Sequence, residues 1–239
     1  MIFLTNTSRS GTLVAETLAQ MGIGAALYEA VISSGDVTRE ALLSRDPPLF
    51  DGLPALPRCA HVGDPSFVPW LFELQLSFVD DVAEADLVVA TGAPRDEAAL
   101  TTLRARLAPA AARDVPLVCT NPDRVIPTAA GLTLGPGAVA AAYAELGARV
   151  FLYGKPHAPI YAAARKQLGN LPAVRMLAIG DLLDTDVRGA RAAGIAAVLV
   201  TATGAHADAL GPAPSASALD ALWTAAGVAP DMVLARLVW

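Results

Sequence analysis

Short apolar runs alternate with longer, alanine-rich stretches along most of this chain. Apolar runs of about four residues are typical of buried strands, and alanine favours helix. We expect strands at 1–4, 87–90, 116–119, 150–153, 176–179, 197–200 and 232–234, and helices at 10–21, 36–44, 96–108, 135–146, 158–168, 185–193 and 216–226. Asp36 is expected to cap the second of these helices, and Pro109 to end the third. Strands that alternate with helices form βαβ units, so the sequence predicts an α/β fold with a parallel sheet.

The composition excludes several classes of protein. With 54% hydrophobic and 17% charged residues, the 239-residue chain is not intrinsically disordered. A net charge of −6 and a pI of about 5.0 argue against binding to nucleic acid or to an anionic membrane surface. No stretch approaches the roughly 18 apolar residues that a membrane span needs. Cys59 and Cys119 have no metal-ligand spacing, so we expect a reduced, cytoplasmic protein.

Polar side chains follow several of the expected strands directly. In parallel sheets, ligands bind at the carboxyl ends of the strands, so these side chains are the first candidates for a functional site. The clusters that follow strands are Thr5, Asn6, Thr7 and Ser8; Thr120, Asn121 and Asp123; Lys155; and Asp181, Asp184 and Asp186.

Asp181 and Asp186 are suited to a hard cation. Mg²⁺ takes oxygen ligands and is commonly held by one or two carboxylates together with waters and substrate phosphate. The alternative is that Asp184 or Thr185 caps the following helix. A cap explains one acidic residue at this boundary, but it does not explain Asp181, which comes directly after the strand and Gly180. The cluster therefore favours a functional site.

Two other clusters offer groups that bind anions. Lys155 lies between Gly154 and Pro156, and its ammonium group could neutralise a phosphoryl group or a buried carboxylate. A solvated surface lysine is the alternative. Thr5 and Asn6, with the two hydroxyl residues that follow, offer donors and backbone N–H groups ahead of a helix. Here the alternative is ordinary helix N-capping.

Gly135–Ala140 reads G-x-G-x-x-A and is close to the dinucleotide-binding fingerprint. Pro136 fits that loop poorly, and no acidic strand end follows at the expected distance. A tight turn with close helix packing is the better interpretation, and a nucleotide-dependent oxidoreductase ranks last among the functions considered. The histidines at 61, 157 and 206 show no ligand spacing, so we expect surface or capping roles for them.

Taken in order, these clusters resemble the motifs of the haloacid-dehalogenase-like (HAD) phosphatases. Leu4-Thr5-Asn6 resembles the second motif of this family, and Gly154-Lys155-Pro156 resembles the third. The run from Gly180 to Asp186 resembles the fourth motif. The order matches the subclass with a large α/β cap between the second and third motifs, class IIA. The resemblance implies a Rossmann-like core formed by residues 1–34 and 148–239.

In this resemblance, residues 35–147 are the inserted cap, and Asn121 and Asp123 on a cap loop face the substrate. The implied reaction is Mg²⁺-dependent hydrolysis of a phosphate monoester, with a small phosphorylated metabolite as substrate. Which metabolite is bound does not follow from the sequence, and neither does the oligomeric state.

The resemblance also assigns roles to the core residues. Thr5 and Asn6 hold phosphoryl oxygens, and Lys155 neutralises the nucleophile and the phosphate. These three are the catalytic candidates. Asp181 binds Mg²⁺, and Asp186 supports either the metal or Lys155, so both are candidate metal ligands.

One family motif has no counterpart in this chain. The first motif, Asp-x-Asp-Gly, supplies the nucleophile and the general acid in this family, and the sequence does not contain it. Its strand lies centrally in the core sheet, and each buried backbone group that it would leave unpaired costs roughly 1–3 kcal/mol. We expect that the chain is N-terminally truncated and inactive in this form. The alternatives are that another chain fills the gap, or that the protein binds phosphorylated ligands without catalysis.

Overall fold

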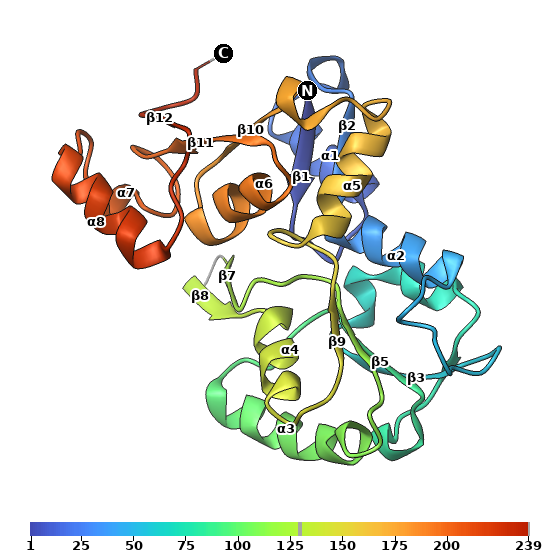
Figure 1. Cartoon of the computed structure of the whole chain (residues 1–239). Helices are drawn as coiled ribbons and strands as arrows, with labels where there is room; N and C mark the ends of the chain where they lie inside the picture. Colours follow the sequence, from blue (N-terminus) through green and yellow to red (C-terminus); the bar gives the residue numbers. More distant parts are fainter. Residues whose placement is uncertain (129–130, 239) are drawn as a thin grey trace. The chain divides into compact units, whose positions relative to one another are not determined.

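The computed structural model describes residues 1–128 and 131–238 (Figure 1). The chain divides into two compact units, Met1–Gly154 and Lys155–Trp239, and each is considered by itself. Within the described residues, no helix has the length and apolar character needed to cross a membrane.

The first unit begins with two parallel strands, β1 (Ile2–Thr5) and β2 (Ala30–Ser33), joined through helix α1 (Gly11–Gln20). Helix α2 (Ser34–Ser44) follows β2 directly and is capped by Ser33, whose side chain accepts from the Asp36 N–H. The Asp36 carboxylate in turn accepts from the backbone of Ser33, which completes a capping box. The prediction that Asp36 is the cap was therefore wrong by three residues, although Asp36 does stabilise this helix end.

A five-stranded parallel sheet forms the rest of the first unit, in the order β4-β3-β5-β6-β9. Its strands are β3 (Arg58–Val62), β4 (Ser77–Phe78), β5 (Leu87–Ala90), β6 (Leu117–Cys119) and β9 (Val150–Leu152). Alternate residues of β5 and β6 enter two separate apolar clusters, one on each face. Parallel sheets need cover on both faces, and this sheet has it.

Helices α3 (Glu97–Ala111) and α4 (Pro136–Ala144) cover one face of this sheet. The segment around Leu49 and Trp70 covers the other. Pro109 does not end α3, contrary to the prediction, because the buried Ala110 and Ala111 continue the helix against the sheet. An antiparallel pair, β7 (Val125–Thr128) and β8 (Gly131–Leu134), precedes α4. Short 3₁₀ helices lie at Ala25–Leu27, Pro65–Phe67, Pro69–Glu73, Val82–Glu84 and, in the second unit, Ala173–Arg175.

The second unit contains a three-stranded parallel sheet in the order β10-β11-β12. Its strands are β10 (Leu177–Gly180), β11 (Ala196–Val200) and β12 (Met232–Leu234), and its helices are α5 (Ala158–Gln167), α6 (Arg188–Ala192), α7 (Ala207–Leu210) and α8 (Ala216–Ala226). A π-helical turn, Leu183–Val187, lies between β10 and α6. β11 is mostly buried, whereas on the edge strand β10 Leu177 is 52% and Ile179 46% exposed.

The predicted α/β class with parallel sheets is confirmed. Strands β5, β6, β9, β10, β11 and β12 lie within one or two residues of their predicted bounds. Strands β2, β3 and β4 and the β7–β8 pair were not predicted. Strand β9 pairs with β6 in the five-stranded sheet. A core formed by 1–34 and 148–239, with 35–147 inserted as a cap, stays a prediction.

Candidate functional site

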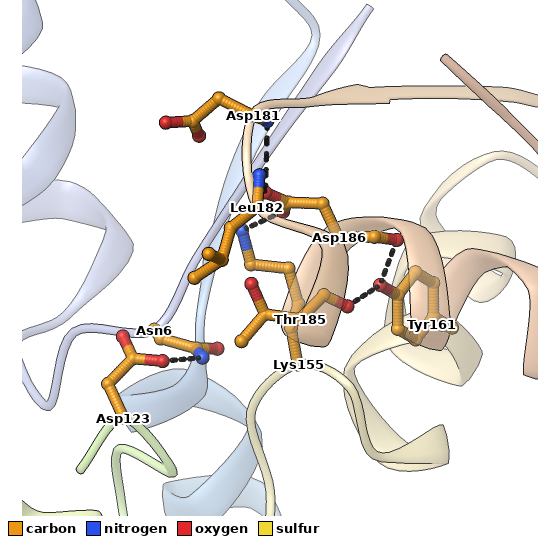
Figure 2. A network of polar contacts seen from close by, with 8 residues as sticks. All are labelled: Asn6, Asp123, Lys155, Tyr161, Asp181, Leu182, Thr185 and Asp186. Carbon is orange, nitrogen blue, oxygen red and sulfur yellow. Dashed lines mark hydrogen bonds and ion pairs between the residues drawn. The ribbon is translucent and has the colours of Figure 1, made fainter. Parts of the chain in front are cut away.

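The loops that follow β1 and β6 bring together polar residues from distant parts of the sequence. Asn6 follows β1, and its Nδ2 donates to Oδ1 of Asp123 over 2.9 Å, across 117 residues (Figure 2). Asn121 Oδ1 accepts the Asp123 N–H at 2.9 Å. Asn6 and Asn121 are both buried. Thr5, the last residue of β1, is anchored through its backbone register with Ser33. The predicted residues of the first unit are therefore neighbours.

Buried hydroxyl groups tie these loops together. Thr120 Oγ1 donates to Ser8 Oγ at 2.5 Å, and Ser8 Oγ donates to the Thr91 carbonyl at 2.9 Å. Ser34 Oγ contacts the carbonyl oxygens of both Thr7 and Thr120. Buried polar groups are costly unless they are hydrogen-bonded, and these are all paired. The network fixes the loop after β1 against the loop after β6.

The glycines of the 135–140 motif have a packing role in this structure. A Cβ at Gly135 would overlap the Asp123 carbonyl oxygen, and a Cβ at Gly137 would overlap that of Pro122. The Gly137 N–H also donates to the Asp123 carbonyl at 3.1 Å. The tight turn with close helix packing, favoured from the sequence, is confirmed. It holds the loop carrying Asn121 and Asp123 against the start of α4.

In the second unit, Lys155 and Asp186 form a largely buried ion pair. Lys155 Nζ lies 2.6 Å from Asp186 Oδ1, and the two side chains are 16% and 13% exposed (Figure 2). The other carboxylate oxygen of Asp186 accepts the backbone N–H groups of Asp181 and Leu182, at 3.3 and 3.2 Å. Hydrogen bonds to a charged group are stronger than those between neutral groups. Asp186 thus holds both Lys155 and the turn after β10.

Asp181 is the first residue after β10. Its Oδ2 accepts the backbone N–H of Ala205 at 2.8 Å, and its other carboxylate oxygen has no hydrogen bond within the described residues. Over the described ranges, no group of three or more His, Cys, Asp or Glu side chains is placed to bind a metal ion. A cation at this position would therefore need ligands beyond the carboxylates of this chain, such as water or phosphate oxygens.

Two side chains near these acids were not identified as site residues from the sequence. Tyr161, on α5, has its hydroxyl 3.3 Å from the carbonyl oxygens of both Thr185 and Asp186. Burial, with Asp186 nearby, raises the pKa of Tyr161, which keeps this donor protonated. His206 Nε2 accepts the Leu183 N–H at 3.3 Å. Both side chains contact backbone groups of the π-helical turn, which was predicted as an ordinary helix from residue 185.

Comparison with known proteins identifies the family. A family model described as HAD-hydrolase-like matches residues 152–234. The solved structure of a hydrolase of the haloacid dehalogenase-like family from Brucella suis 1330 is 30% identical, with a TM-score of 0.76. The alignment covers 99% of this chain and 83% of that one. The chain therefore belongs to the haloacid dehalogenase-like family, and the predicted resemblance is confirmed.

Two other matches are phosphatases. The p-nitrophenyl phosphatase from Archaeoglobus fulgidus is 26% identical, with a TM-score of 0.72, and the alignment covers 99% of this chain and 83% of that one. A dihydroxyacetone phosphatase from Corynebacterium glutamicum (strain R) is 37% identical over 84 residues. That match spans 35% of this chain and only 30% of the curated protein.

Proposed function

We propose that this chain is the greater part of a Mg²⁺-dependent phosphate monoester hydrolase of class IIA, acting on a small phosphorylated metabolite. The observation that carries the proposal is the turn after β10. There Asp186 binds Lys155 and two backbone amides, and Asp181 keeps one carboxylate oxygen free of hydrogen bonds within the described residues. A lysine held on Asp186, together with a carboxylate on the same turn that keeps one oxygen available, suits a phosphoryl group and the metal that accompanies it.

The proposal assigns each predicted residue a role. Thr5 and Asn6 donate to phosphoryl oxygens, and Lys155 offsets the charge that develops on the transferring group. Asp181 would hold Mg²⁺ together with waters and the substrate phosphate, and the bound ion would act as a Lewis acid on a phosphoryl oxygen. Asp186 keeps Lys155 and the 181–182 backbone in place.

Two further residues, Asn121 and Asp123, are assigned to substrate recognition. They lie on the loop that α4 and the Asn6 amide hold in place. We propose that residues 35–147 form the cap on which this loop is carried. Two buried free cysteines, Cys59 and Cys119, agree with the proposal of a reduced, cytoplasmic protein.

Covalent phosphoryl transfer needs a carboxylate nucleophile, and the sequence has no Asp-x-Asp-Gly. We propose that a further strand, outside these 239 residues, carries this aspartate and adds to β10 at the edge with which no described strand pairs. The half-exposed Leu177 and Ile179 on that edge strand support the proposal, because parallel sheets are normally covered. β1 likewise pairs with β2 alone among the described strands. Without the added strand, the chain is expected to be inactive.

The absent motif also supports a second candidate, a protein that binds phosphorylated ligands without hydrolysing them. An aryl phosphate assay with Mg²⁺, on protein produced in its native host, distinguishes the hydrolase from the binding protein. Asp181→Asn should lower turnover roughly 100-fold or more, as is typical when one electrostatic stabiliser of the transition state is lost. Asp184→Asn is the matched control, because Asp184 is 70% exposed and pairs only with Arg188 in the described structure, and it should retain activity. Phosphate binding with no turnover in the unmodified protein would instead support the binding protein.

A further inference from the structure

The segment Gly204–His206, which follows β11, contacts the turn that carries Asp181. We propose that His206 is a positioning residue that fixes this turn, so that the free oxygen of Asp181 is held ready for a divalent cation. The inference rests on the proposed function, because it takes Asp181 as the metal ligand. It adds a residue that neither the motifs nor the comparisons assign.

Side chains bind the backbone N–H groups of three successive residues at this turn. The amides of Asp181 and Leu182 donate to Asp186 Oδ2, and the amide of Leu183 donates to His206 Nε2 at 3.3 Å. Leu183 is the first residue of the π-helical turn, where N–H groups have no partner within the helix. His206 therefore provides, from 23 residues away, the bond that completes this set.

The same segment also binds the Asp181 carboxylate itself. The Ala205 N–H donates to Asp181 Oδ2 at 2.8 Å. Gly204 makes this approach possible: its φ is +89°, and a Cβ there would overlap the Asp181 carboxylate. One carboxylate oxygen of Asp181 thus accepts a hydrogen bond from the Ala205 N–H. The backbone N–H groups of residues 181–183 are held by the side chains of Asp186 and His206.

His206 can play this part only as a hydrogen-bond acceptor. For Nε2 to accept the Leu183 N–H, the imidazole must be neutral with its proton on Nδ1. A glutamine at this position retains an acceptor oxygen, whereas a leucine retains bulk and loses the acceptor. Comparing these two substitutions distinguishes the effect of losing the hydrogen bond from the effect of changing the packing.

The test measures Mn²⁺ binding by titration calorimetry and amide hydrogen exchange at Leu183, in the full chain. His206→Leu should weaken Mn²⁺ binding roughly tenfold, as is typical when a partner that orients a metal ligand is removed. It should also speed exchange at the Leu183 amide. His206→Gln should restore both quantities substantially. If His206→Leu leaves Mn²⁺ affinity unchanged, or if His206→Gln fails to restore it, the inference is overturned.

Two further variants keep the test decisive. Asp181→Asn should abolish Mn²⁺ binding; if it does not, the proposed function fails, whatever His206 does. If His206→Leu does not fold, Gly204→Ala takes its place, with Gly211→Ala as its control. Both glycines have positive φ, at +89° and +68°, but a Cβ at Gly211 meets nothing within 4 Å. Only Gly204→Ala should weaken Mn²⁺ binding, and equal effects would contradict the inference.

Discussion

At the scale of single residues, the ion pair between Lys155 and Asp186 is the most buried ion pair described in the second unit. Its two side chains are mostly removed from water, and they meet at 2.6 Å. Removing one partner of such a pair leaves the other charge desolvated, which costs more than the pair itself contributes. The pair also positions Lys155, the cationic side chain that we assign to the phosphoryl group.

Lys155→Met should therefore affect both stability and activity. We expect the free energy of unfolding to fall by about 1–3 kcal/mol, because the Asp186 carboxylate loses a charged partner. Turnover of an aryl phosphate should fall roughly 100-fold or more. Urea unfolding and steady-state kinetics measure these effects. The control is Lys166→Met, an exposed position in the last turn of α5. Equal losses in the two variants would contradict this account of Lys155.

Which residues could be predicted depended on the kind of contact they make. Lys155 and Asp181 stood out because they follow strands directly, and strand ends can be located from short apolar runs. His206 and Tyr161 could not be found in this way. Their partners are backbone groups of the 183–187 turn, and neither the π-helical geometry of that turn nor its neighbours are encoded in a local pattern.

At the scale of elements, the contact between the start of α4 and the loop at 121–123 positions the proposed substrate-binding residues. The contact depends on the absence of side chains at Gly135 and Gly137, where Cβ atoms would meet backbone oxygens. Backbone cannot move aside as a flexible side chain can. The loop and the helix must therefore separate if either glycine acquires a side chain.

Gly137→Ala tests this contact. Alanine is favoured over glycine in a helix by about 1 kcal/mol. We nevertheless expect a net loss of about 2 kcal/mol in unfolding free energy, because the added methyl group overlaps the Pro122 carbonyl. Gly24→Ala is the control, since a Cβ there meets nothing within 4 Å, and it should leave stability nearly unchanged. A stabilised Gly137→Ala protein, measured by urea unfolding, would show that the contact is not this tight.

Elements also differ in how far the sequence predicts them. The strands β5, β6 and β11 are buried apolar runs, and their positions were predicted within two residues. Strand β3 carries arginine and histidine, and β4 has only two residues, so neither gives an apolar run. The end of α3 was predicted wrongly at Pro109. The helix continues because the packing of the buried Ala110 and Ala111 outweighs the loss of the backbone N–H at Pro109.

At the scale of the whole molecule, the two units differ in how completely their sheets are covered. The five-stranded sheet has an apolar cluster on each face. In the second unit, the edge strands β10 and β12 leave large apolar side chains exposed: Leu177, Ile179, Met232, Val233 and Leu234. The sequence predicted the α/β class and the family, because strand–helix alternation and motif order are linear properties. It could not predict which strands would be left uncovered.

The reactivity of the two buried cysteines measures whether the first unit is folded. Cys59 and Cys119 are completely buried, one in each apolar cluster, and burial raises the pKa of each thiol to about 12. The thiolate is the reactive form, so both thiols should resist a disulfide reagent in the native protein and react at the rate of unfolding. Single Cys→Ser variants assign the signals, measured as a function of urea. Fast labelling of either thiol without denaturant would contradict the described packing.

We propose that these residues form most of a phosphatase whose nucleophile is carried on an added strand. The most direct measurement is the intact mass, with the N-terminal sequence, of the polypeptide that co-purifies with Mg²⁺-dependent aryl phosphatase activity from the native host. We predict an active polypeptide that contains this sequence together with a further segment bearing Asp-x-Asp, and hence a mass above 24.5 kDa. An active polypeptide of 24.5 kDa would contradict the claim, because hydrolysis would then proceed without the added strand.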